Sequence, residues 1–224
     1  MTKRITVAID GPAGSGKSTL ARRIAAKLGY AYVDTGAMYR AVALWAIRAK
    51  VALSDMHRLE QLAKEARIEF NPDSSTVLLN GEDVTQAIRT PEIGAAASKI
   101  SQVAAVRRAL VAKQRAFGEQ ASVVMEGRDI GSVVFPDATV KIFLDAEPEA
   151  RTDRRAQELS MPAAVVAQQI HERDRRDRTR TESPLVQAPD AVYVDTTGLT
   201  IDEAEAALLK LIRDRTSNGK ERTH

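Results

Sequence analysis

Apolar runs and amphipathic stretches alternate along most of this chain. Five short runs rich in β-branched residues are typical of buried strands. They cover residues 4–10, 31–34, 121–125, 140–144 and 192–194. Between them apolar residues recur at helical spacing, as in Leu20, Ile24 and Leu28, with Gly29 placed to end that helix. The alternation predicts an α/β fold, with a five-stranded parallel sheet and helices on both of its faces.

Capping chemistry indicates where several of the helices begin and end. Thr35-Gly36 opens an alanine-rich helix, Thr90-Pro91 places a cap residue before a first-turn proline, and Thr200 with Glu203 forms a capping box. Further helices are predicted from Ser54 to Arg67, from Ser101 to Phe117 with a stop at Gly118, and from Pro148. The polar stretch from Thr216 to His224 is predicted to be a frayed tail.

The segment that follows Arg67 has a different pattern. Short extended runs are separated by turn residues at 71–75 and by Asn80-Gly81, which is a strong hairpin signal between extended runs. A small antiparallel sheet is therefore predicted as an insertion at residues 68–98. It would lie inside a larger part of the chain, residues 35–118.

Residues 11–18, Gly-Pro-Ala-Gly-Ser-Gly-Lys-Ser, match the template of a phosphate-binding loop. Glycines reach backbone angles that are closed to other residues, so main-chain N–H groups can converge on an anion. Lys17, expected in a solvated loop, would reach the outer phosphates, and Ser18 would place its hydroxyl on Mg²⁺. A strand before the motif and a helix after it supply the context that this chemistry needs. The alternative is a glycine-rich turn in an unrelated α/β protein.

Two further stretches carry candidate site residues. Residues 126–131, Glu-Gly-Arg-Asp-Ile-Gly, follow a core strand, at the end of an open parallel sheet where ligands bind. Gln168 to Arg180 is rich in arginine, and Arg173, Asp177 and Arg180 are predicted to share one helix face. A solvated charged helix is the alternative for that stretch. Phosphoryl transfer needs mobile cations, so residues 151–184 are predicted to form an arginine-rich lid.

Composition limits the class of protein. The 224 residues suit a single domain, with 44% hydrophobic residues, a net charge of +3 and no cysteine. Disulfides and thiolate metal sites are thereby excluded, and a reducing cytosol is compatible. Neither a leader sequence nor a membrane-spanning run is found. The expectation is a cytoplasmic, unanchored protein that is a monomer.

With Asp34-Thr35-Gly36-Ala37-Met38-Tyr39-Arg40 added to these motifs, the chain resembles the bacterial cytidylate kinases over essentially its whole length. Adenylate kinases would show Asp-Gly-Phe-Pro-Arg where this chain has Glu126-Gly127-Arg128-Asp129. Shikimate kinases would show an Asp-x-Asp pair near Asp34. The segment between Leu159 and Ile170 looks short for the family, which leaves the extent of lid movement open.

The resemblance implies a role for each matching residue. The ATP phosphates would be wrapped by Gly11, Pro12, Ala13, Gly14, Ser15, Gly16, Lys17, Ser18 and Thr19. The acceptor's phosphate would meet Thr35, Arg40 and Arg128. The cytosine would be read by Ser98, Arg107 and Asp129, and the sugar and phosphate by Arg173, Asp177 and Arg180. Simpler alternatives stay open: Ser98 could cap a helix end, Arg107 could pair with a surface acid, and Asp34 could be a structural cap.

The expected activity is Mg²⁺-dependent, in-line transfer of the γ-phosphoryl group of ATP to CMP or dCMP. Lys17, Arg128, Arg173 and Arg180 would be the catalytic cations. No general base is needed, because the acceptor is already an anion, and none of the three histidines is given a role. The alternatives are a kinase of UMP or of a shikimate-like alcohol, and an ATP-switched RNA-binding protein. Nucleic acid and membranes are not expected partners.

Overall fold

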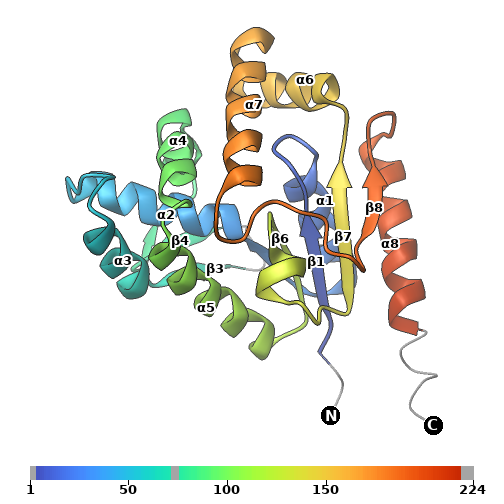
Figure 1. Ribbon diagram of the computed structural model, residues 1–224. Helices are drawn as coiled ribbons and strands as arrows, with labels where there is room; N and C mark the ends of the chain where they lie inside the picture. Colours follow the sequence, from blue (N-terminus) through green and yellow to red (C-terminus); the bar gives the residue numbers. More distant parts are fainter. Residues whose placement is uncertain (1–3, 72–75, 218–224) are drawn as a thin grey trace. The chain divides into compact units, whose positions relative to one another are not determined.

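A computed structural model describes residues 4–71 and 76–217 (Figure 1). The chain forms two compact units, Met1–Ala31 with Ala121–His224, and Tyr32–Gln120. A single domain was predicted, with a distinct part at residues 35–118, and the second unit covers nearly that same range. The predicted turn at residues 72–75 and the predicted tail beyond residue 217 lie outside the described residues.

The main sheet has the strand order β2-β6-β1-β7-β8. Its strands are β1 (Thr6–Asp10), β2 (Ala31–Asp34), β6 (Val123–Gly127), β7 (Val140–Asp145) and β8 (Val192–Asp195). β1 runs parallel to β6 and β7, with Asp10 opposite Gly127 and Phe143, so these strands end at the same edge. The five-stranded parallel sheet is confirmed. Its carboxyl edge holds the loop after Asp10 and the segment after Gly127.

Burial explains why the central strands are apolar throughout. Val7, Ala8 and Ile9 of β1 are fully buried, as expected for a strand with neighbours on both sides and helices over the sheet. Helix α1 (Lys17–Leu28) buries Leu20 and Ile24 and ends at Gly29 as predicted. It packs beside α8 (Ile201–Ser217), the red helix of Figure 1, whose capping box at Thr200 is confirmed.

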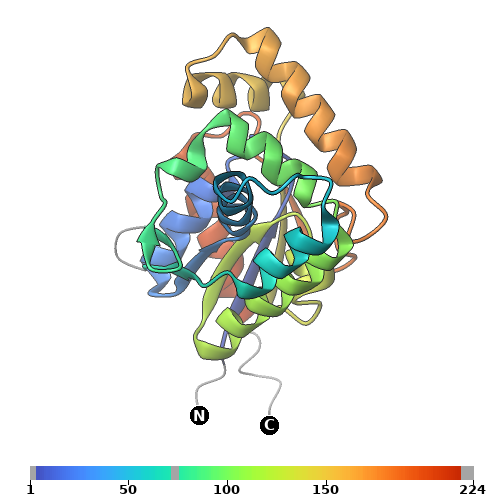
Figure 2. The same ribbon diagram turned by 90° about the vertical axis from the view of Figure 1, so that its left-hand side faces the viewer.

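Helices α6 (Pro148–Leu159) and α7 (Ala163–Thr179) lie side by side in both ribbon views (Figures 1 and 2). Pro148 occupies the first turn of α6, as predicted. The predicted placement of Arg180 on the face of α7 is wrong, because the helix ends at Thr179 and Arg180 is extended, with ψ of 141°. Its side chain nevertheless turns back toward Asp177, which lies 3.8 Å away.

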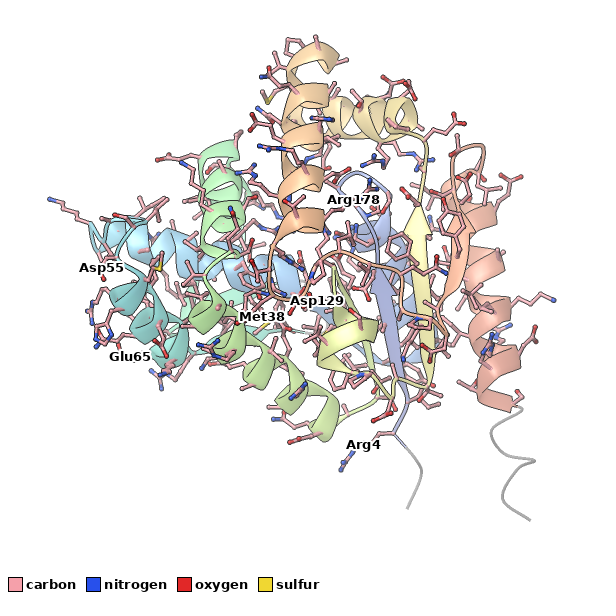
Figure 3. All side chains as sticks on the ribbon, in the orientation of Figure 1. Arg4, Met38, Asp55, Glu65, Asp129 and Arg178 are labelled. Carbon is pink, nitrogen blue, oxygen red and sulfur yellow. The ribbon has the colours of Figure 1, made fainter. Side chains whose placement is uncertain are left out.

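The second unit contains helices and a small sheet. Its elements are α2 (Thr35–Arg48), α3 (Met56–Glu65), β3 (Ile68–Phe70), β4 (Val77–Leu79), β5 (Glu82–Asp83), η1 (Ala87–Arg89), α4 (Pro91–Ile100) and α5 (Ala104–Gln120). Figure 3 labels both ends of α3, where Asp55 caps the helix by accepting from the amide of Arg58. The helices place the candidate residues of this unit, which lie on α2, α4 and α5.

The small antiparallel sheet is confirmed, with a hairpin that turns at Asn80-Gly81. Its strands end at Asp83, however, whereas the predicted insertion extended to residue 98. The difference arises because Ile93 and Ile100 bury the inner face of α4. Helix α5 also passes the predicted stop at Gly118. Within the described residues, no helix has the length and hydropathy that crossing a membrane would require.

Candidate functional site

The loop between β1 and α1 can be built only with glycine at two of its positions. Gly11 has a φ of 150° and Gly14 a φ of 77°. A Cβ on Gly11 would lie 1.9 Å from the carbonyl oxygen of Leu144, and one on Gly14 would lie 2.7 Å from that of Arg151. Both are impossible contacts with backbone atoms. The loop therefore has the compact, glycine-dependent form that the phosphate-binding prediction requires.

Lys17 is buried, with 5% of its surface exposed, so the expectation of a solvated lysine is wrong. Its ammonium folds back onto the loop and donates to the carbonyl oxygen of Pro12 at 2.5 Å and to Ser15 Oγ at 3.2 Å. Burial, with the nearby guanidinium groups of Arg128 and Arg173, lowers the pKa of Lys17 to about 7. An anion arriving at the loop would favour the charged form of this lysine.

Ser18 and Glu126 meet beside the loop. The Ser18 hydroxyl donates to Glu126 Oε1 at 2.6 Å, and Glu126 lies buried near the end of β6. One hydroxyl and one carboxylate suit Mg²⁺, which commonly takes its other ligands from substrate phosphates and water. Among the described residues, no cluster of three or more acidic, histidine or cysteine side chains could hold a metal by itself. The donor set thus fits a cation that arrives with a nucleotide.

Asp10 ends β1 and fixes the segment after β6. Its two carboxylate oxygens accept from the amides of Ile130 at 2.8 Å and Gly131 at 2.7 Å. Burial raises the pKa of Asp10 to about 7, although these two hydrogen bonds oppose the shift. No role was predicted for Asp10. The available signal was an acidic residue at the end of an otherwise apolar strand.

The segment after β6 and helix α7 are joined by ion pairs around Asp177. Arg128 Nε lies 2.8 Å from Asp177 Oδ2, and Arg173 Nε lies 4.0 Å from the same oxygen. Arg180 lies 3.8 Å from Asp177 and 3.6 Å from Asp129. Burial works to raise the pKa of Asp177, but the surrounding guanidinium groups hold it below its usual value. The structure therefore brings five of the predicted residues together in one charged network: Arg128, Asp129, Arg173, Asp177 and Arg180.

The arginine-rich stretch divides into two groups. Arg173 and Arg180 join the network at Asp177, whereas Arg178, labelled in Figure 3, is exposed. A solvated charged helix accounts only for the second group. The density of arginine in the sequence did not separate the two, because the distinction depends on which helix face is covered.

In the second unit, Arg40 is held by Asp34 at the start of α2. Arg40 Nη2 donates to Asp34 Oδ2 at 2.7 Å, while Asp34 Oδ1 accepts from the amide of Ala37 at 2.8 Å. The capping role left open for Asp34 is therefore confirmed. Although burial opposes it, the Arg40 guanidinium and the Ala37 amide hold the pKa of Asp34 below its usual value. Thr35 is buried in the first turn of the same helix.

Ser98 on α4 and Arg107 on α5 are both buried. Arg107 donates to the carbonyl oxygen of Ser101 at 3.3 Å, and its guanidinium lies 5.6 Å from the ring centre of Tyr39. The Arg107 side chain is therefore buried and does not lie on the surface. The Ser98 hydroxyl has no hydrogen-bond partner within the described part of the chain, and a buried hydroxyl in that state is suited to a ligand. No separate role was predicted for Tyr39.

Comparisons with known proteins identify relatives of nearly the whole chain. The family profile described as "Cytidylate kinase" matches residues 7–214. The chain is 59% identical over 226 residues to a protein of Solibacter usitatus (strain Ellin6076) named cytidylate kinase, covering 98% of this chain and 97% of that protein. It is 47% identical over 222 residues to one of Ligilactobacillus salivarius (strain UCC118) with the same name, covering 96% and 99%.

Among solved structures, a gluconokinase from Sinorhizobium meliloti 1021 has the same fold. Its TM-score is 0.53 at 15% sequence identity, and the match covers 99% of this chain and 100% of that one. At that identity the likeness concerns the fold alone. The profile match and the near full-length relatives go further: this chain belongs to the cytidylate kinase family.

Proposed function

We propose that this chain transfers the γ-phosphoryl group of ATP to CMP or dCMP, giving ADP and the nucleoside diphosphate. Membership of the family supports the substrates. The observation that carries the chemistry is the glycine-dependent loop with Lys17 folded beneath it and Arg128 and Arg173 nearby. Such a concentration of cations at a glycine-dependent loop is suited to a polyphosphate.

The donor is bound by residues 11–19. The amides of the loop and the ammonium of Lys17 would contact the phosphates, and Ser18 and Glu126 would hold Mg²⁺. The metal ion neutralises charge on the phosphate oxygens when it is bound. Without a nucleotide, the Lys17 ammonium donates hydrogen bonds to Pro12 and Ser15. Binding of ATP would exchange these internal hydrogen bonds for contacts with the phosphates.

The residues that the proposal assigns to the acceptor form three groups. Thr35, Arg40 and Arg128 bind its phosphate, and Arg173, Asp177 and Arg180 bind its sugar and phosphate. Ser98, Arg107 and Asp129 read the cytosine, whose amino group donates beside two acceptors. In this assignment residues 35–118 are the monophosphate-binding part and residues 151–184 are the lid.

Catalysis then depends on position and charge rather than on proton transfer. The attacking group is a phosphate oxygen, already negative, and the transferred group carries negative charge throughout. Lys17, Arg128, Arg173 and Arg180 stabilise that charge without needing to reorganise during the step. Asp177 keeps the three arginines at the site in the absence of a nucleotide, because it is the carboxylate that they share.

A panel of acceptors tests the proposal. Purified protein is mixed with ATP, Mg²⁺ and each nucleoside monophosphate or shikimate in turn, and ADP release is followed. We expect CMP and dCMP to be the best acceptors. Preference for UMP or for an alcohol would support another kinase of the same fold. Salt-sensitive retention of RNA without phosphoryl transfer would support the RNA-binding alternative.

A further inference from the structure

We propose that Arg151 and Asp174 are positioning residues that set the phosphate-binding loop through Ala13. The inference rests on the proposed function only in treating residues 11–19 as the ATP site. The pair, called here the Ala13 clamp, consists of one residue from α6 and one from α7. Asp174 contacts the amide of Ala13, and Arg151 contacts its carbonyl oxygen.

The contacts of the Ala13 clamp are buried hydrogen bonds. Asp174 Oδ1 accepts from the amide of Ala13 at 3.3 Å, and Arg151 Nη1 donates to the carbonyl oxygen of Ala13 at 3.1 Å. Between themselves, Arg151 Nη1 and Asp174 Oδ2 lie 2.5 Å apart. Arg151 is 6% exposed and Asp174 is 7% exposed. The pair is therefore a desolvated, closed set of hydrogen bonds rather than a surface ion pair.

Apolar contacts reinforce the clamp. The methyl group of Ala13 packs against Val166 and Ile170 of α7, and the loop between β1 and α1 lies beside both lid helices (Figure 1). The absent side chain of Gly14 also permits the backbone of Arg151 to approach closely. Residue 13 is thus the point at which α6 and α7 dock on the loop.

Peptide geometry explains what the clamp controls. In a planar trans peptide, the C=O and N–H groups point in opposite directions. Because Arg151 holds the carbonyl oxygen of Ala13, the amide of Gly14 must point away from Arg151. The amide of Ala13 is meanwhile occupied by Asp174. The clamp therefore removes one loop amide from the phosphates and orients the next.

The clamp also places the negative charge of Asp174 beside a site for anions. Arg151 supplies the opposite charge, with its Nη1 atom 2.5 Å from Asp174 Oδ2. Without Arg151, Asp174 would be a buried carboxylate with no such partner at a loop that binds phosphates, and it would repel them. Loss of Arg151 should consequently be worse for ATP than loss of both charges together.

The test measures binding of a non-hydrolysable ATP analogue by calorimetry, and KM for ATP and for CMP separately. Arg151→Ala should weaken analogue binding by about tenfold or more, and KM for ATP should rise while KM for CMP changes little. In Arg151→Ala/Asp174→Asn, analogue binding should recover in part. Glu172→Gln is the matched control, because Glu172 is an exposed acid on α7, the helix that carries Asp174. This variant should bind the analogue like the wild type.

Unchanged analogue binding in Arg151→Ala, or a double variant that is weaker than Arg151→Ala, would overturn the clamp. If Arg151→Ala does not fold, Arg151→Lys and Asp174→Asn replace it, and each should still raise KM for ATP; wild-type values in both would equally overturn the inference. The proposed function fails separately, if the wild type binds the analogue but does not phosphorylate CMP.

Discussion

The two units hold their arginines in different ways. In the first unit, Arg128 pairs with Asp177, which lies 49 residues away in the sequence. In the second unit, Arg40 pairs with Asp34, six residues away in the first turns of one helix. The first arrangement exists only while α7 is docked, whereas the second forms with α2 itself. Charge placement in the first unit is therefore a property of tertiary structure, and in the second it is local.

This difference bears on what each substitution should do. A change at a long-range pair removes a charge contact and also loosens the helix that supplies it. A change at a local pair affects the ligand contact and leaves the helix in place.

The largest effect is expected at the loop of the first unit. Lys17→Ala should lower kcat on the order of 10²-fold or more, because a preorganised cation at the transferring group is lost. The control is Lys210→Ala, which alters an exposed lysine of α8. Turnover close to the wild-type rate, with an unchanged melting temperature, would remove Lys17 from the mechanism.

Asp177→Asn tests the long-range pair directly. The guanidinium groups around Asp177 would lose their shared counter-ion, and breaking a buried ion pair in this way costs about 3 kcal/mol. Urea unfolding should show that loss, and amide exchange in α7 should become faster.

Asp34→Asn is the local counterpart. An asparagine can still cap α2, so this variant should weaken CMP binding and leave exchange in α7 unchanged. Equal effects of both variants on α7 would contradict the contrast.

Asp129→Asn should change which base is accepted. The carboxylate suits the amino donor of cytosine, whereas an amide can turn to donate to the carbonyl of uracil. A mispaired buried contact costs roughly 1–3 kcal/mol, so the UMP to CMP ratio of kcat/KM should rise by about tenfold to a hundredfold. If activity on both nucleotides falls by the same factor, Asp129 acts through Arg180, 3.6 Å away, and does not read the base.

The last prediction concerns the pH dependence of folding stability at Asp10, not the activity. A pKa raised from 3.8 to about 7 means that folding favours the protonated carboxyl, so this contribution to stability is complete below pH 3.8 and is lost as the pH rises through 7. Relative to Asp10→Asn, the wild type should lose stability between these pH values, by at most about 1.4 kcal/mol per pH unit. Chemical unfolding at several pH values measures it. Parallel curves for the two proteins would show that Asp10 does not titrate in this window.

Local signals explain what the sequence could predict. The glycine-rich loop, the Asn80-Gly81 hairpin and the capping box at Thr200 each depend on neighbouring residues, and all have the expected structure. The strand pattern similarly predicted the sheet, since buried parallel strands are apolar along their whole length. The candidate residues at 11–18 and 126–131 could be predicted because each segment directly follows one of these apolar strands.

Contacts between distant residues account for what was missed. Asp10 meets Ile130, 120 residues away, and Arg151 meets Ala13 across 138 residues, so no sequence spacing relates either pair. The burial of Lys17 likewise depends on how the loop folds back over it. Arg180 shows the same limit over a shorter distance. Helical spacing predicted that it shares a face with Asp177, but the helix ends at Thr179, so helical spacing does not apply to Arg180.

The most direct test of the account follows the phosphoryl group itself. ATP labelled at the γ-phosphate is incubated with the protein, Mg²⁺ and CMP, and the products are separated. The account predicts label in CDP, in an amount equal to the ADP formed, and loss of that label with Lys17→Ala. Label that appears only in inorganic phosphate, or that enters UDP but not CDP when UMP is also supplied, would contradict it.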